Sequence, residues 1–435
     1  MFSKTLAALA VALTLPFLHG CGNDNANQGE VRLINATSEY TSLDLYTLDS
    51  AGTNDLVVGG TAAGAASAYT GIDKGSYTFN VKSSASTGSA TPATGTISKT
   101  DHYSIVTYLT GSTTKTQFLS DEEDNPASGN AKLRVLNAAT SEAPSVDVYL
   151  TSSDCTALAV TDTAFASAVT GLQAAYTQVT AAAAGTPWNV CVFAAGDTST
   201  LLLDLPALKL KNQEIATLIL THTAGGVLLN AAVLDQQGAY TAYANTITRL
   251  RVVADAANTA PVTVVLNGVT LTSGAPSPSV GDYTTVAVGA LAPTITIGSG
   301  TAAGFTLAPA VAGNDYTLLV SGTAGAPAAT LISDSNTPST STTLTVKARV
   351  INGLNLTNGS VSATIDSKLI GTAAFATASS YTNFLPSTGT STVHATTTGT
   401  NPADLINQTF SAGNVYTVFV YGDASAPVLA PVLDH

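Results

Sequence analysis

Charged and chemically reactive side chains are scarce in this 435-residue chain. Charged residues make up only 10% of it, and it holds three Cys, one Met, one Trp and five His. The 15 Lys and Arg are outnumbered by 28 Asp and Glu, so the net charge of −13 repels phosphate backbones and excludes nucleic acid as the main partner. Few side chains remain for acid–base or metal chemistry. We therefore expect no enzymatic activity, no catalytic residues, no metal site and no cofactor.

Strand-forming and turn-forming residues fill the rest of the sequence. Hydrophobic residues account for 45% of the chain, which is enough to build cores. Apolar and polar residues alternate with a period of two at Leu43–Tyr46 and Tyr77–Val81, and Asn-Gly pairs such as Asn267-Gly268 mark turns. No convincing helical periodicity follows the first 20 residues. The sequence predicts an all-β fold of the immunoglobulin-like, antiparallel sandwich type.

The first 20 residues are typical of a cleaved signal peptide, because their apolar stretch is too short to span a membrane comfortably. They run into Leu18-His19-Gly20-Cys21, which resembles the lipobox of bacterial lipoproteins. The resemblance implies acylation of Cys21, a lipidated tether at 21–29 and anchoring in a membrane. Because no Asp follows Cys21, it also implies an outer-membrane lipoprotein of the cell envelope, facing the periplasm or the surface. An ordinary secretory peptide with an incidental cysteine is the alternative.

Two markers recur along the chain in one phase. The first is an Arg followed by branched apolar residues, and the second is a Tyr-Thr pair about 30 to 45 residues later. The arginines are Arg32, Arg134, Arg251 and Arg349, and the tyrosines are Tyr69, Tyr176, Tyr283 and Tyr381. A period of roughly one hundred residues is too long for a solenoid and matches a small domain. We expect four tandem sandwiches at 30–124, 130–240, 246–335 and 343–435, joined by short linkers into a stalk.

Both markers are predicted to be structural. An Arg can cover apolar surface with its stem while its guanidinium binds a carboxylate, and one Arg per hundred residues is too sparse to bind a polyanion. We expect each Arg to pair with the Asp that closes its own repeat. These aspartates are Asp121, Asp235, Asp334 and Asp434. For the tyrosines, repetition in register with the fold favours packing or a tyrosine-corner role over stacking against a carbohydrate.

Cys155 and Cys191 are the cysteines that remain once Cys21 is acylated, and an exported protein meets an oxidising compartment. We therefore expect a disulfide, which would contribute about 4 kcal/mol by closing a loop of about 36 residues. The strand alternation places Cys191 on the side opposite the core, as a peripheral staple. A redox-active or metal-binding pair is the alternative, but the sequence has no CxxC motif.

The acidic run Asp121–Asp124 is the one candidate for a Ca²⁺ site, because hard cations prefer several carboxylates. Consecutive side chains diverge, however, so a solvated linker is the preferred interpretation.

The first two repeats resemble a known family. Arg134–Ala138 followed by Ser145–Tyr149, and Arg32–Ala36 followed by Ser42–Tyr46, look like the opening of the DUF4397 domain, an exported β-rich module of unknown function. The resemblance covers about residues 30 to 240 and implies no catalytic residues.

The sequence as a whole predicts a non-enzymatic, lipid-anchored envelope protein that acts as a spacer or a binding and adhesion stalk. Its partner would be an envelope protein or a polysaccharide. The alternatives are a periplasmic or surface carbohydrate-binding or hydrolytic protein, and an assembly subunit.

Overall fold

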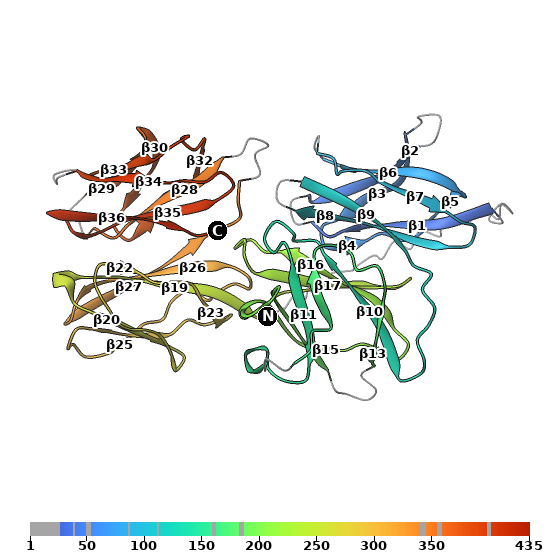
Figure 1. The fold of residues 1–435 in the computed structure, drawn as a ribbon, viewed down its shortest axis with the longest axis horizontal. Helices are drawn as coiled ribbons and strands as arrows, with labels where there is room; N and C mark the ends of the chain where they lie inside the picture. Colours follow the sequence, from blue (N-terminus) through green and yellow to red (C-terminus); the bar gives the residue numbers. More distant parts are fainter. Residues whose placement is uncertain are drawn as a thin grey trace, which may run out of the picture.

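The computed structural model describes residues 27–435 except 38–39, 49–53, 86–87, 111–112, 159–161, 182–186, 340–344, 355–358 and 398–401. The expected signal peptide and Cys21 therefore lie outside the described residues. Strands dominate, and helix is limited to short 3₁₀ turns such as η2 (Cys155–Ala157) and η3 (Ala257–Thr259). Over the residues described, no helix is long and apolar enough to cross a membrane. The predicted all-β fold of tandem sandwiches is confirmed (Figure 1).

Each repeat forms two packed sheets, which we call the inner and the outer sheet. In unit 1 the inner sheet has the order β4-β1-β8-β9, with β5 also paired to β1, and the outer sheet has the order β3-β2-β6-β7. The strands of unit 1 are β1 (Gln28–Asn35), β2 (Ser42–Leu48), β3 (Asn54–Ala62), β4 (Ala65–Ala66), β5 (Thr70–Asp73), β6 (Gly75–Ser83), β7 (Ala93–Ile97), β8 (His102–Thr110) and β9 (Thr113–Ser120).

Unit 2 repeats this plan and extends its inner sheet by one edge strand. Its strands are β10 (Asn130–Asn137), β11 (Val146–Thr151), β12 (Ala166–Val169), β13 (Thr177–Thr180), β14 (Trp188–Ala194), β15 (Asp197–Leu208), β16 (Ile215–His222), β17 (Leu229–Asp235) and β18 (Tyr240–Tyr243). The inner sheet has the order β13-β10-β16-β17-β18 and the outer sheet β12-β11-β14-β15. The added strand β18 leads directly into unit 3.

Units 3 and 4 have matching sheets. Unit 3 contains β19 (Ile247–Ala256), β20 (Val262–Leu266), β21 (Val269–Ala275), β22 (Ser279–Val280), β23 (Thr284–Ala287), β24 (Pro293–Ile297), β25 (Ala303–Gly304), β26 (Asp315–Thr323) and β27 (Ala326–Asp334). Unit 4 contains β28 (Val346–Asn352), β29 (Ser360–Ile365), β30 (Lys368–Ala374), β31 (Thr377–Ala378), β32 (Thr382–Phe384), β33 (Ser391–Thr397), β34 (Ala403–Gln408), β35 (Val415–Asp423) and β36 (Ala426–Leu433).

The first strand of every unit pairs in parallel with the first strand of the unit's last long hairpin, whereas the other strand pairings are antiparallel. These parallel pairs are β1 with β8, β10 with β16, β19 with β26, and β28 with β35. A parallel pair needs a long crossover connection, and here the crossover passes through the whole outer sheet. The expected antiparallel sandwich therefore contains one parallel pair per unit, which places the first strand of each unit in the middle of its inner sheet.

The inner sheets are buried on both faces, because units pack against each other in pairs. In unit 1, Leu33 belongs to the unit's own core, whereas the next residue, Ile34, joins a second cluster. We call this second cluster the 1·2 interface; it consists of Ile34, Ala36, Val106, Tyr108 and Leu119 of unit 1 with Leu136, Ala138, Ile219, Ala232 and Leu234 of unit 2. The corresponding 3·4 interface consists of Val253, Leu319 and Ile332 of unit 3 with Ile351, Phe419 and Tyr421 of unit 4.

The four units are therefore arranged two by two and not in single file. Figure 1 shows unit 1 against unit 2 and unit 4 against unit 3, with units 2 and 3 adjacent. Units 2 and 3 meet where Thr223 Oγ1 donates to the Gly313 carbonyl at 2.7 Å and Asn336 N donates to the Gly225 carbonyl at 2.9 Å. A Cβ on Gly225 would lie 2.3 Å from the Gly313 oxygen, so this approach requires glycine. The short linkers therefore do not hold the four sandwiches in single file, because the units pack against one another in pairs.

Candidate functional site: buried arginine clusters between paired units

The repeated arginines lie on the first strand of each unit and point into the space between two inner sheets. Their exposed fractions are 3% for Arg32, 8% for Arg134, 1% for Arg251 and 2% for Arg349. The parallel register places a Ser or Thr beside each one, and the Arg Nε donates to its hydroxyl. The acceptors are Ser104 (2.8 Å), Thr217 (3.0 Å), Thr317 (2.9 Å) and Thr417 (3.3 Å). In three units this Ser or Thr directly follows a Tyr, as in Tyr103-Ser104, Tyr316-Thr317 and Tyr416-Thr417.

The repeated tyrosines cover the guanidinium groups. The distances from the Arg Cζ to the ring centroid are 4.7 Å for Tyr69, 4.3 Å for Tyr176, 4.5 Å for Tyr283 and 4.7 Å for Tyr381. Such cation–π contacts gain strength when they are removed from water. A different set of tyrosines caps the backbone in the manner of a tyrosine corner: the hydroxyls of Tyr103, Tyr316 and Tyr416 each accept from a backbone N–H five residues upstream.

In the pair of units 3 and 4, the arginines bind the closing aspartate of the neighbouring unit. Arg251 of unit 3 donates to Asp434 of unit 4 at 2.6 Å, and Arg349 of unit 4 donates to Asp334 of unit 3. The pairing within a unit is weaker, because Arg251 NH2 lies 3.9 Å from Asp334 Oδ2. Asp334 also accepts hydrogen bonds from Tyr283 (2.6 Å) and Thr317 (2.7 Å). The expectation that each Arg pairs mainly within its own repeat is wrong for this pair.

In the pair of units 1 and 2, Arg32 also reaches into the neighbouring unit, but it meets carbonyl groups there. Its guanidinium donates to the Asp235 carbonyl at 2.9 Å and to the Gly238 carbonyl, while Asp121 of its own unit lies 3.7 Å away. Asp121 accepts hydrogen bonds from Tyr69 and Ser104, both at 2.6 Å. The expected pairing of Arg32 with Asp121 is therefore present as the longer contact of this arginine.

Arg134 departs most from the expectation. Its predicted partner Asp235 turns its carboxylate toward Lys211 at 3.5 Å. Arg134 Nε donates to the Thr217 hydroxyl, and the guanidinium lies over the Tyr176 ring. Among the described residues, its buried NH2 atom has no hydrogen-bond partner. The positive charge of Arg134 acts to lower the pKa of Asp121 in unit 1, so this electrostatic interaction also crosses the unit boundary. The 1·2 cluster thus has two arginines around one buried aspartate.

Burial dominates the electrostatics of both clusters. Desolvation raises the pKa of Asp121, although hydrogen bonds from Ser104 and Tyr69 and the nearby arginines act in the opposite direction. Desolvation likewise raises the pKa of Asp434 against the stabilising charge of Arg251. Buried carboxylates in this position are tolerated because the guanidinium groups compensate them. The carboxylates are engaged by fixed donors, so the arrangement is suited to holding two units together and not to proton transfer.

Sequence reasoning did not find a second ion pair in unit 3. Arg249, two residues before Arg251, donates to Asp315 through two nitrogens, with the Nε contact at 2.8 Å, and its Cζ lies 4.4 Å from the Tyr283 ring. Asn336 Nδ2 also donates to Asp315 at 2.7 Å. The spacing of two residues between Arg249 and Arg251 is the sequence feature that indicates this second charge, because it places both arginines on one face of a strand.

The Asn that follows the Arg by three residues ties the two sheets together. Asn35 Nδ2 donates to the Thr61 carbonyl of the outer sheet at 3.2 Å, and its Oδ1 accepts from Thr37 N at 3.1 Å. Asn137 and Asn352 make the same kind of contacts. Unit 3 has Ala254 at this position, and there the Ser277 hydroxyl accepts the corresponding backbone N–H.

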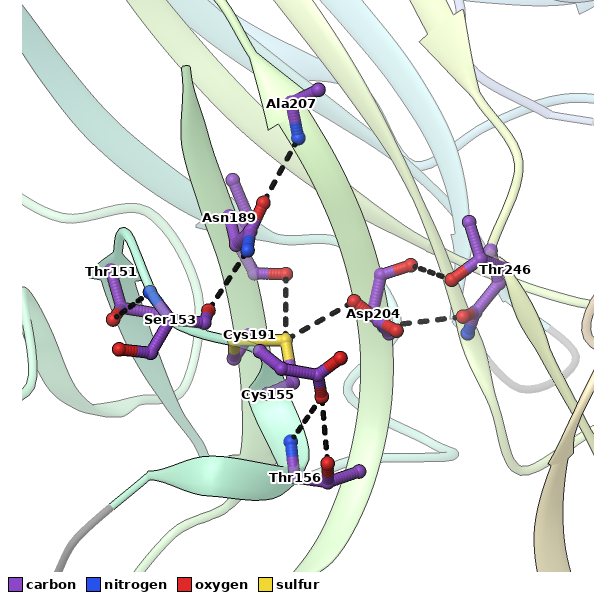
Figure 2. Close-up of a disulfide and its surroundings, with 12 residues drawn as sticks. Thr151, Ser153, Cys155, Thr156, Asn189, Cys191, Asp204, Ala207 and Thr246 are labelled. Carbon is purple, nitrogen blue, oxygen red and sulfur yellow. Dashed lines mark hydrogen bonds between the residues drawn. A yellow bond between two sulfur atoms is a disulfide. The ribbon is translucent and has the colours of Figure 1, made fainter. Parts of the chain in front are cut away.

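The predicted disulfide between Cys155 and Cys191 is confirmed (Figure 2). Cys191 lies on the outer face of β14, as expected, but it is fully buried and not peripheral. It belongs to a cluster that includes Ile247 at the start of unit 3. Beside it, the Asp204 carbonyl accepts from the Thr246 hydroxyl at 2.9 Å, so the disulfide supports the region where unit 2 continues into unit 3.

The acidic run does not gather around a common centre. Asp121 is buried with Arg32, Glu122 binds His102 at 2.8 Å, and Glu123 accepts from Lys132 at 2.5 Å. Within the described part of the chain, no group of three His, Cys, Asp or Glu could hold a metal ion. The run is a linker in which the carboxylates of Asp121, Glu122 and Glu123 each bind a different partner.

The fold and these clusters define a class: a tandem β-sandwich protein whose units pair through buried arginine, tyrosine and aspartate side chains. Residues 29–149 match the family described as "Domain of unknown function (DUF4397)", so the chain contains a DUF4397 domain. The match covers unit 1 and the first two strands of unit 2, a shorter span than the resemblance to residue 240 that the motifs suggested. None of the curated proteins compared with the chain matches it.

Several solved structures are distantly similar to this chain. A candidate cell adhesion protein from Bacteroides uniformis is 13% identical, with 48% of this chain and 99% of that chain covered and a TM-score of 0.21. The Bacillus anthracis TIE protein is 9% identical, with 92% and 69% covered and a TM-score of 0.15. A pneumococcal glycogen-degrading virulence factor, SpuA, is 12% identical, with 94% and 38% covered and a TM-score of 0.18. At these TM-scores the similarity carries no inference about function.

Proposed function

We propose that the protein is a non-enzymatic, lipid-anchored protein of the cell envelope, in which two pairs of sandwiches form a firm spacer that presents binding surfaces. One observation carries this proposal: the repeated Arg, Tyr and Asp side chains bind partners inside the molecule, where they join units across their inner sheets. The outer sheets and the loops are left to face a partner. The lipobox-like Leu18-His19-Gly20-Cys21 supports the anchor.

The position of the tyrosines favours this proposal over a carbohydrate-binding or hydrolytic protein. A ring that stacks on a sugar must expose one face, whereas Tyr69, Tyr176, Tyr283 and Tyr381 lie against guanidinium groups. Asp121, Asp334 and Asp434 are equally engaged, so they do not offer the paired carboxylates of a glycosidase. An envelope protein or a polysaccharide remains the class of partner that we propose.

The anchor is tested on the protein as the cell makes it. Mass spectrometry of the mature chain is expected to find Cys21 at the N-terminus with added acyl mass. Cys21→Ala should move the protein from the membrane fraction to the soluble fraction, whereas Cys155→Ala should not. An unmodified mature chain that begins elsewhere would contradict the proposal.

The non-enzymatic part is tested separately with a panel of polysaccharide and peptide substrates. We expect binding without turnover. Turnover that a single Asp or Glu substitution abolishes would make the protein a hydrolase.

A further inference from the structure

A pocket of about 380 Å³ opens at one end of the 3·4 interface, where β19, β26 and β35 end. Asp255 forms part of its wall and is only 7% exposed. Its Oδ1 accepts a hydrogen bond from Gly422 N at 2.7 Å. Its Oδ2 receives no hydrogen bond from any residue that the structure describes. A buried carboxylate with one hydrogen bond is poorly compensated, because an ionised carboxylate can accept about four.

The fold itself does not require this carboxylate. Relative to the repeated arginines, Asp255 occupies the position that Ala36, Ala138 and Gly353 occupy in the other units. Gly353 makes room for it, since a Cβ there would lie 2.3 Å from Asp255 Oδ2. In the other three units, the first strand therefore ends in the same way without an ionisable side chain at this position.

The pair of units 1 and 2 offers an internal comparison. A pocket of about 390 Å³ lies at the corresponding end of its interface, lined by Ala36 in place of Asp255 and by His222 in place of Gly422. The correspondence follows from the strand registers, because Thr217 and Thr417 face equivalent arginines. Pairing of the units thus creates the pocket, and its chemistry differs from one pair to the other.

The 3·4 pocket favours a cation. Its lining includes a second carboxylate, Asp423, whose Oδ1 accepts from Ser425, together with the side chains of Thr259 and Ser321, and it includes no Lys, Arg or His. Burial raises the pKa of Asp255 to about 7, against the hydrogen bond from Gly422. Near neutral pH a positively charged group beside Oδ2 would stabilise the ionised form.

The size of the pocket distinguishes between kinds of cation. Its volume of about 380 Å³ is more than ten times the roughly 30 Å³ that one water occupies in the liquid, which is far more than a bare ion needs. Ca²⁺ prefers six to eight oxygen ligands, and among the described residues no group of three acidic, His or Cys side chains could hold a metal ion. The neutral hydroxyls suit an organic molecule with polar substituents.

We propose that the pocket between units 3 and 4 binds a small organic cation through a primary ammonium group, which donates hydrogen bonds to Asp255 Oδ2. The surrounding hydroxyls contact the rest of the ligand. This site is independent of the anchor and of the spacer role.

The test uses the full mature chain and a matched pair of probes. Ethanolamine carries an ammonium group, and ethylene glycol replaces that group with a neutral hydroxyl. In a saturation-transfer difference NMR titration, we expect saturable binding of ethanolamine and none of ethylene glycol. Asp255→Asn, which keeps the acceptor for Gly422 N–H, should weaken ethanolamine binding at least tenfold. Asp282→Asn, an exposed change in the same unit, should leave it unaltered.

Two further measurements keep the test decisive. Thr323→Lys places an ammonium group at the exposed rim of the pocket and should block ethanolamine without disturbing the core. Binding should also be stronger at pH 8 than at pH 5.5, because Asp255 ionises in this interval; the other titratable groups that face it are Asp423 and the Tyr421 phenol.

Three results would overturn the proposal. Equal binding of the two probes would show that the charge is not recognised. Undiminished ethanolamine binding by an Asp255→Asn protein with a normal thermal transition would place the ligand elsewhere. Displacement of ethanolamine by an equal concentration of CaCl₂, with loss of the Ca²⁺ effect in Asp255→Asn, would make this a metal site.

Discussion

Asp334 connects units 3 and 4, and its replacement is the sharpest test of the pairing. The side chain is fully buried and belongs to unit 3, yet its closest charged partner is Arg349 of unit 4. It also accepts from the Tyr283 and Thr317 hydroxyls of its own unit. Asp334→Asn preserves the shape of the side chain and removes its charge. Arg349 then lies buried without a carboxylate, while Arg251 retains Asp434.

The expected loss is large because one partner of a buried ion pair is left uncompensated. Such a change costs about 3 to 5 kcal/mol of unfolding free energy. For a cooperative unit of 150 to 250 residues, 1 kcal/mol shifts the melting temperature by about 2 to 4 °C. If units 3 and 4 unfold together, their common transition should therefore fall by about 6 to 20 °C.

Differential scanning calorimetry of the full mature chain measures this shift. We expect one transition for units 3 and 4 to move as a whole and the transition of units 1 and 2 to stay in place. Asp282→Asn, an exposed change in unit 3, is the matched control and should have no effect. If the transition of unit 3 moved alone and unit 4 melted as before, the units would be independent and the reasoning from the interface would be refuted.

Three further predictions follow from the same structure. Replacing Cys155 and Cys191 together with Ala should lower the unfolding free energy by about 4 kcal/mol in the chain-entropy model. Calorimetry should show this as a lower common transition of units 1 and 2, with the transition of units 3 and 4 unchanged. A fragment of residues 27–240 should be a monomer by light scattering, whereas a fragment of residues 27–124 should self-associate or aggregate through the exposed half of the 1·2 interface; a monodisperse, monomeric short fragment would contradict this. Burial raises the pKa of Asp255 to about 7, so its contribution to stability is complete below its unfolded pKa near 4 and is lost as pH rises through 7. The melting temperature of units 3 and 4 should therefore fall between pH 5 and 8, and it should fall less in Asp255→Asn. An equal fall of the melting temperature with pH in the variant would argue against titration of Asp255 as the cause.

The sequence predicted the repeats and the strands well, because both depend on local patterns. The alternation at Tyr77–Val81 corresponds to β6, and the repeated Arg marks the first strand of every unit. The disulfide was predictable because the two cysteines lie in one repeat, and the expected export of the chain would place them in an oxidising compartment. Fold class and repeat number therefore follow from period and composition.

The pairing of units was not predicted, although a signal for it was present. Leu218–Leu220 is a continuous apolar run, which is typical of strands covered on both faces, and the structure buries it completely, as it does Leu133–Asn137. A single sandwich would cover only one face, so such runs indicate a second layer. The identity of that layer depends on contacts between units, such as Arg32 with Asp235 and Arg251 with Asp434, which are 203 and 183 positions apart, and no local pattern specifies them. Arg349 and Asp334 are only 15 positions apart, but their pairing depends on how units 3 and 4 are packed, so it could not be predicted either.

The two pairs differ in how their buried charges balance, and this difference leads to a last prediction. Units 3 and 4 place two arginines against two aspartates, whereas units 1 and 2 place Arg32 and Arg134 against Asp121. Arg134 is the poorly compensated member, because among the described residues no carboxylate lies within ion-pair distance of its guanidinium, whereas Arg251 has Asp434 at 2.6 Å. Replacing a poorly paired buried charge with an apolar side chain of similar length is often neutral or stabilising.

Arg134→Met should accordingly change the melting temperature of units 1 and 2 by no more than about 3 °C, which corresponds to about 1 kcal/mol. Arg349→Met, the same change in the balanced cluster, should lower the transition of units 3 and 4 by about 6 °C or more, because it leaves Asp334 buried without its closest positive charge. Calorimetry of the two variants side by side compares the clusters directly. Equal losses would mean that the two arginines are equally compensated and that the difference in their contacts has no energetic consequence.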